Sequence, residues 1–213
     1  MTRVAGVDAA LGGWVAVVLS DGAFADADLL ADFGAVVGAL WDVAAIGVDV
    51  PIGLPIEGRR RADVEARRFV GARRASVFFA PPRGAFEQPD YGSARARYRG
   101  VSAQAWALRR AVLDVERFAA DPRVHEVHPE VSFRALAGRE LVFGKRSWNG
   151  QQERLALLRA TGIELPARLE AGLAPADDVI DAAAAAWSAH RIARGEAQPL
   201  PAGHVSRVGA IWY

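Results

Sequence analysis

The chain has 213 residues, of which 52% are hydrophobic, so it can bury a substantial core as one large domain or two small ones. It contains no cysteine, which excludes disulfide bonds, thiolate zinc sites and cysteine nucleophiles. The formal net charge is +1, so the overall charge indicates no particular class of partner.

The charges are unevenly divided along the chain. Residues 1–58 contain one cation, Arg3, and eight acids, which gives a net charge of −7. Residues 59–110 contain thirteen arginines and four acids, which gives a net charge of +9. This pattern fits an acidic metal site beside a cationic surface for a polyanion. It fits equally an arginine-rich helix packed on an acidic neighbour.

The first fifty residues predict three strands, a helix and a fourth strand. Apolar runs at 4–7 and 14–19 indicate a β-hairpin, and a third strand is expected near 24–29. Residues 32–41 have helical spacing, and their apolar face would contain Phe33, Val36, Val37, Leu40 and Trp41. The fourth strand is the apolar run 44–50, which Pro51 stops. This order of elements predicts a mixed sheet in an α/β fold.

The rest of the chain is predicted to be mostly helical. Helices are expected at 59–70, 101–119, 151–160 and 178–194. Residues 71–100 contain too much proline and glycine for regular structure. Short strands are expected at 124–127 and 208–213. We therefore expect a single domain over residues 1–213, with a helical and loop insertion at about 51–123.

The sequence also lacks the marks of a membrane protein. No apolar run is long enough to span a bilayer, and the N-terminus does not resemble a signal peptide. We therefore expect a cytoplasmic protein without a membrane partner. Nothing in the sequence indicates an oligomeric state.

Four aspartates stand where a metal site would need them. Asp8 and Asp49 end predicted strands that a crossover helix would place side by side. Asp178 and Asp181 are spaced to share one face at the start of the last long helix. Carboxylates gathered in this way can hold two divalent ions roughly 3.5–4 Å apart, and Mg²⁺ or Mn²⁺ suits such ligands. Each aspartate also has a structural interpretation, as a turn residue or a helix cap.

Other charged residues are candidates for the same site. Glu130 follows the predicted strand 124–127 and is a fifth acidic candidate for catalysis. Arg73, Arg74 and Arg83 flank the segment SVFFAPPR, where they would hold phosphates or pair with the acidic N-terminal block. Lys145 would bind phosphate or cap its own loop. It is the one lysine among 26 Lys and Arg residues, so arginine counts alone carry little functional information.

These motifs, taken in order, resemble the domain-of-unknown-function family 429, a family of predicted RNase H-like nucleases. In the RNase H-like superfamily the chain is most similar to the RuvC-type branch. The matching segments run almost from end to end and are GVDAALGGW (6–14), GVDVPIGLP (47–55), RRADVEARRFVGARRASVFFAPPR (60–83), EVHPEVSF (126–133), DDVIDA (177–182) and GAIWY (209–213). The spaced residues Lys145, Gly150 and Arg154 match as well.

The resemblance implies a fold and a set of ligands. It implies an RNase H-like mixed sheet of about five strands, the first three antiparallel, flanked by helices. The metal-binding acids of the superfamily would correspond to Asp8, Asp49, Asp178 and Asp181. Glu130 would be an additional polar residue of this family.

Three functions from different classes are open at this point. The first is a Mg²⁺- or Mn²⁺-dependent nuclease that hydrolyses DNA or RNA by a two-metal carboxylate mechanism. The second is a nucleotide-binding ATPase or kinase-like protein of the actin and sugar-kinase type, which normally needs two such domains. The third is a non-catalytic module that binds nucleic acid or protein on the same scaffold.

Overall fold

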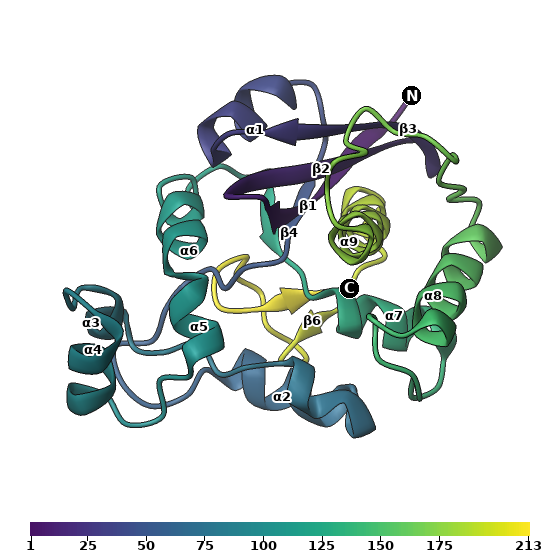
Figure 1. Ribbon diagram of the computed structural model, residues 1–213. Coiled ribbons are helices and arrows are strands. Elements are labelled where there is room, and N and C mark those ends of the chain that lie inside the picture. Colours follow the sequence, from purple (N-terminus) through teal and green to yellow (C-terminus); the bar gives the residue numbers. More distant parts are fainter.

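Five strands form a mixed sheet in the order β3-β2-β1-β4-β5 in the computed structural model, which describes residues 1–213 (Figure 1). The strands are β1 (Arg3–Ala10), β2 (Gly13–Ser20), β3 (Ala23–Leu30), β4 (Ile46–Val48) and β5 (Val124–Glu126). The first three are antiparallel, and β4 and β5 run parallel to β1. The predicted α/β fold with a five-stranded mixed sheet is therefore confirmed.

Helices cover both faces of this sheet. On one face lies α9 (Ala176–Ala193), with α7 (Pro129–Ala137) and α8 (Trp148–Ala160) packed beside it (Figure 1). On the other face lie α1 (Phe33–Ala39) and α6 (Arg109–Glu116). Successive residues of β2 alternate between the two cores, as the period of a strand requires. The core on the α9 side takes Val15, Val17 and Leu19, and the core on the α1 side takes Trp14, Ala16 and Val18.

Helix α9 packs very closely on β1 and β4. The helix presents a run of buried alanines, 182–186, so its backbone is separated from the sheet by single methyl groups. The strands contribute glycine at the contact: a Cβ atom on Gly6 would overlap backbone atoms of Ala182 and Ala186. A Cβ atom on Gly47 would lie 2.7 Å from the carbonyl oxygen of Ala185. Small residues on both sides thus set the distance between helix and sheet.

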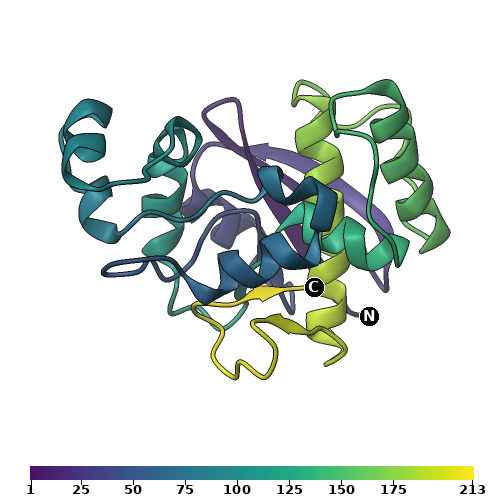
Figure 2. The same cartoon turned by 90° about the horizontal axis from the view of Figure 1, so that it is seen from below.

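The segment between β4 and β5 consists of short helices. They are α2 (Arg61–Phe69), the 3-10 helix η1 (Gly71–Ser76), α3 (Arg83–Phe86), α4 (Tyr91–Arg97), α5 (Ala103–Ala107) and α6. In both views α3 and α4 lie at the opposite end of the molecule from α8 (Figures 1 and 2). The expectation of irregular structure at 71–100 is therefore wrong. Proline and glycine limit these helices to a turn or two but do not prevent them, and Asp90 caps α4 by accepting from Ser93 N at 2.8 Å.

Two further expectations about helices are corrected. The predicted helix 101–119 divides at Leu108, so that Trp106 of α5 packs near Phe86 while Val112 of α6 packs into the sheet core. Trp41 does not belong to a buried helical face, because α1 ends at Ala39 and the Trp41 side chain is 77% exposed.

Helix α7 begins directly after β5 and was not expected from the hydrophobic pattern. Its start has recognisable signals, since Pro129 occupies the first turn and Glu130 is acidic there. The predicted C-terminal strand is only β7 (Ile211–Trp212), which pairs with β6 (Pro199–Leu200) in a separate two-stranded sheet. None of the helices combines the length and the hydropathy that crossing a bilayer requires.

The packing of α9 predicts opposite effects for two glycine substitutions. Gly6→Ala should lower the free energy of unfolding by about 3 kcal/mol or more, because its methyl group has no space between β1 and α9. Gly38→Ala, in an exposed position of α1 with no atom near the added Cβ, should raise it by about 0.5–1 kcal/mol. Urea denaturation of wild type and both variants measures their free energies of unfolding. A Gly6→Ala variant as stable as Gly38→Ala would contradict the packing argument.

Candidate metal centre

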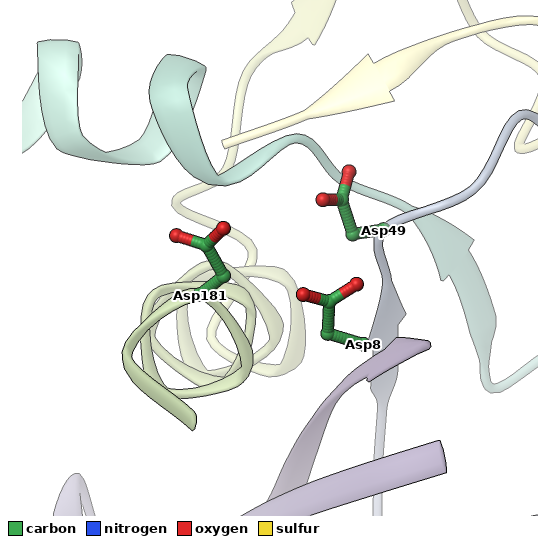
Figure 3. Close-up of side chains that lie close together, drawn as sticks. All are labelled: Asp8, Asp49 and Asp181. Carbon is green, nitrogen blue, oxygen red and sulfur yellow. The ribbon is translucent and has the colours of Figure 1, made fainter. Parts of the chain in front are cut away.

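Three aspartates from different elements converge at one edge of the sheet. Asp8 lies within β1, which continues to Ala10 and so does not end at Asp8 as expected. Asp49 directly follows β4, and Asp181 lies near the start of α9 (Figure 3). Each offers one carboxylate oxygen, and the three oxygens lie within 4.8 Å of one another. The strand pairing explains the first two, because β1 and β4 are parallel and Val7 is opposite Val48. The predicted adjacency of the strands that carry Asp8 and Asp49 is confirmed.

A single ammonium group lies against this cluster. Lys145, in the loop before α8, donates a hydrogen bond from Nζ to Asp181 Oδ2. Its Nζ is also 3.9 Å from Asp177 Oδ2. The side chain of Lys145 is 31% exposed, whereas Asp8 and Asp181 are 7% and 3% exposed. The cluster therefore consists of three carboxylates and one partly solvated cation.

Burial and mutual repulsion perturb these carboxyl groups. Burial is the main cause that raises the pKa of Asp49 and of Asp181 to about 7. Burial, followed by the charges of Asp49 and Asp181, raises the pKa of Asp8 well above its usual value. Lys145 acts in the opposite direction on all three groups. Without further positive charge, the cluster therefore retains protons at pH values where aspartates are normally ionised.

The cluster lies in a cleft of about 310 Å³. Its walls come from η1, α7, the α5–α6 junction, the loop before α8 and the start of α9. Besides the three aspartates and Lys145, the polar residues lining it are Arg73, Ser76, Gln104, His128, Glu130 and Asp178. The cleft thus collects most of the candidates predicted from the sequence, although they are spread over more than 170 residues of the chain.

Asp178 lines the cleft but stands apart from the compact group of three. It is partly exposed, and burial together with the nearby charge of Asp177 raises its pKa. Neither Asp177 nor Asp178 caps α9, since Pro175 occupies the cap position without a side-chain hydrogen bond. The interpretation of Asp178 as a helix cap is therefore wrong, and its carboxylate is available to the cleft.

Glu130 is held by two arginines. It is buried at the start of α7, and Nη2 of the fully buried Arg154 donates to both of its carboxylate oxygens, at 2.8 and 2.9 Å. Arg73 Nη2 lies 3.5 Å from Glu130 Oε1. Arg154 was not assigned a role from the sequence, where an arginine within a helix gives no sign of burial. The Glu130 carboxylate thus joins α7 to α8 through Arg154 and positions Arg73 of η1 at the cleft.

His128 also borders the cleft, and its surroundings favour one neutral tautomer. Its Nδ1 accepts a hydrogen bond from Glu130 N at 3.2 Å, so a neutral ring carries its proton on Nε2. Burial lowers the pKa of His128, which favours this neutral form. The ring therefore caps α7 on one side and can present an N–H group on the other.

The remaining predicted arginines lie outside the acidic cleft. Arg83 is on α3, where it pairs with Glu116 and lies 3.6 Å from Glu87. Arg74 lines a separate depression of about 500 Å³, which we call the basic pocket. The other charged and aromatic residues of the basic pocket are Arg59, Arg67, Arg68, Phe79 and Glu140. Only Arg73 of the three predicted arginines thus reaches the acidic cleft.

A second buried ionic network lies outside the residues that line the cleft, and it was not predicted from the sequence. Arg60 donates to Asp63 and, through two nitrogens, to Glu126 at 2.6 and 2.8 Å. Glu126 Oε2 also accepts from Ile52 N at 2.7 Å, and Asp63 Oδ2 accepts from Ala80 N at 2.8 Å. This network ties β5, α2 and the segments around residues 52 and 80 together. The acid Glu126 within the predicted strand 124–127 is its one sequence signal.

Comparison with known families places the whole site in one sequence family. A family model described as a protein of unknown function (DUF429) matches residues 6–205. The chain belongs to the DUF429 family. The DUF429 match includes every residue of the aspartate cluster and its two arginine networks. No curated protein and no solved structure matches the chain significantly.

The raised pKa values predict how stability depends on pH without divalent cations. Because the folded-state pKa of Asp49, about 7, exceeds the unfolded value, ionising Asp49 destabilises the fold. This penalty is absent below about pH 4 and complete above about pH 7. The unfolding free energy of Asp49→Asn relative to wild type should therefore rise between these pH values, by on the order of 2–4 kcal/mol.

Denaturation from pH 4 to 8 in a chelating buffer measures this difference. Asp28→Asn is the matched control, because Asp28 is an exposed residue of β3, and its difference from wild type should stay flat. An Asp49→Asn curve parallel to wild type would contradict the electrostatic description of the cluster.

Proposed function

We propose that this DUF429 protein is a metal-dependent nuclease that hydrolyses phosphodiester bonds of DNA or RNA. We further propose that its sheet and acid cluster are those of an RNase H-like fold of the RuvC type. The observation that carries the proposal is the convergence of Asp8, Asp49 and Asp181 at one sheet edge, inside a cleft that also holds cationic side chains. Nucleic acid is the substrate class that fits both an acid cluster and the surrounding basic residues.

The donor set fits a divalent cation. Three carboxylate oxygens within 4.8 Å of one another are hard ligands, which Mg²⁺ and Mn²⁺ prefer. Asp8, Asp49 and Asp181 would hold the cation, with Asp178 as a further acid at the cleft. Bound there, the cation would activate water and stabilise the charge that develops on phosphate oxygens.

The chain's own residues would bind and orient the substrate. Arg73 points into the cleft from η1 and is partly exposed, so it can donate to a phosphate while Glu130 holds its position. Phe78 lines the same cleft and provides a surface for stacking on a base. His128 carries an Nε2 proton in its neutral form and can donate one more hydrogen bond at the cleft.

The basic pocket extends this binding surface. The short helix η1 separates the two depressions: Arg73 and Ser76 line the acidic cleft, whereas Arg74 lines the basic pocket. In the basic pocket the guanidinium groups of Arg59 and Arg67 lie over Phe79, 4.1 and 4.8 Å from its ring centroid. A nucleic acid strand crossing η1 would thus place one phosphate near the acid cluster and a neighbouring phosphate against arginines.

The direct test is a cleavage screen. Purified protein with Mn²⁺ or Mg²⁺ should cleave at least one substrate among single-stranded, duplex and branched DNA and RNA. Asp8→Asn keeps the shape of the side chain but removes a charge, and should lower the cleavage rate by about 100-fold or more. Asp28→Asn, remote and exposed, should cleave like wild type. Cleavage that persists in a chelating buffer, or no cleavage of any substrate, would overturn the proposal.

Binding should depend on salt and on the basic pocket. Affinity for nucleic acid should fall steeply as salt rises, because neutralised phosphates release counterions. Arg74→Ala should weaken binding to all nucleic acid sequences. It should also reduce, by about one, the slope of the logarithm of the binding constant against the logarithm of salt concentration. Arg95→Ala, at an exposed position on α4, should leave both unchanged. Fluorescence anisotropy in Ca²⁺ measures both quantities, and affinity that ignores salt would contradict the predicted interface.

A further inference from the structure

The one lysine of the chain is the residue that contacts the acid cluster. Of 26 Lys and Arg residues, Lys145 alone is a lysine, and its Nζ donates to Asp181 Oδ2. In a chain that otherwise uses arginine for positive charge, this position holds the compact ammonium group. Arginine presents a planar fork of five donors, whereas lysine presents a small point charge with three donors. The charge that contacts Asp181 is therefore the smaller of the two kinds.

The loop that carries Lys145 is anchored on both sides of it. Arg154 Nη1 donates to Phe143 O at 3.2 Å and to Gly150 O at 2.9 Å. Ser147 Oγ donates to Gly144 O at 2.8 Å and, by accepting from Gly150 N at 3.1 Å, caps α8. The flanking residues are thus tied to the buried Arg154 and to the start of α8. This anchoring keeps the ammonium group at the cluster.

The charges in the cluster suit one divalent cation rather than two. Three ionised carboxylates carry −3, and Lys145 together with one divalent cation supplies +3. A second divalent cation would bring the total to +5, and the further acid at the cleft that is not held by arginines is Asp178, which lies outside the compact group. Lys145 occupies Asp181 Oδ2, which leaves the other oxygen of Asp181 for a cation.

We propose that Lys145 takes the place of the second cation, so that the cleft binds a single divalent ion at Asp8, Asp49 and Asp181. This inference deepens the proposed function and rests on it, replacing two ions by one ion and an ammonium group. Lys145 Nζ then has donors left for an oxygen of the substrate phosphate. Its positive charge does not have to be recruited from solution.

Counting bound Mn²⁺ tests the proposal without nucleic acid or catalysis. Isothermal titration of the full chain should give one Mn²⁺ per wild-type molecule. Lys145→Met preserves the length of the side chain but removes its charge, and should bind the first Mn²⁺ about tenfold or more tightly, because a competing cation is gone. Arg146→Ala removes an equal charge from the adjacent residue, whose side chain is 87% exposed and pairs with Asp177. Its Mn²⁺ affinity should stay within about threefold of wild type.

The outcomes separate this inference from the function on which it rests. Two Mn²⁺ per wild-type chain, or an unchanged affinity in Lys145→Met, would overturn the role of Lys145 alone. No Mn²⁺ binding would overturn the metal centre and the nuclease proposal together. One Mn²⁺ per chain without cleavage of any nucleic acid would overturn the nuclease proposal and leave the cation count standing. If Lys145→Met does not fold, two Mn²⁺ per wild-type chain would still overturn the proposal.

Discussion

The close packing of α9 on β1 is the constraint on which the rest of the site depends. Asp181 reaches Asp8 only because Gly6 and the buried alanines let two backbones meet with almost nothing between them. A larger residue at this contact would move the start of α9 away from the sheet, and the carboxylate of Asp181 would then lie farther from those of Asp8 and Asp49. Helix α9 also packs closely on β4 at Gly47, so the close packing fixes the positions of α9, β1 and β4 relative to one another.

This arrangement has an electrostatic cost. Burial of the three carboxylates is the main cause that raises their pKa values, and the negative charges of neighbouring acids raise them further. Lys145 offsets only one of the three charges. Perturbed acids of this kind are typical of sites that bind a ligand of opposite charge. Binding such a ligand stabilises the ionised carboxylates and so stabilises the folded state.

Two buried arginines join the elements around the sheet edge through ion pairs. Arg60 joins β5 to α2 through Glu126 and Asp63, and Arg154 joins α7 to α8 through Glu130. Removing either partner of such a pair leaves an uncompensated buried charge, which destabilises a protein far more than losing a surface pair. Of the two networks only the Arg154 network reaches the cleft, through Glu130, and it positions Arg73 and the loop that carries Lys145.

The strands, the hairpin and the approach of β4 to β1 followed from local patterns, because apolar periodicity and turn residues act over a few residues. Local patterns also indicate the acids: Asp8 and Asp49 lie at the ends of apolar runs, and Asp181 is spaced to share a helix face with Asp178. Only the tertiary structure decided that Asp178 stands apart, that Arg83 faces α6 instead of the cleft, and that Lys145 lies against Asp181. Those outcomes depend on the distance between α9 and the sheet and on loops tied by buried arginines. Such contacts join residues far apart in the chain, and no local pattern encodes them.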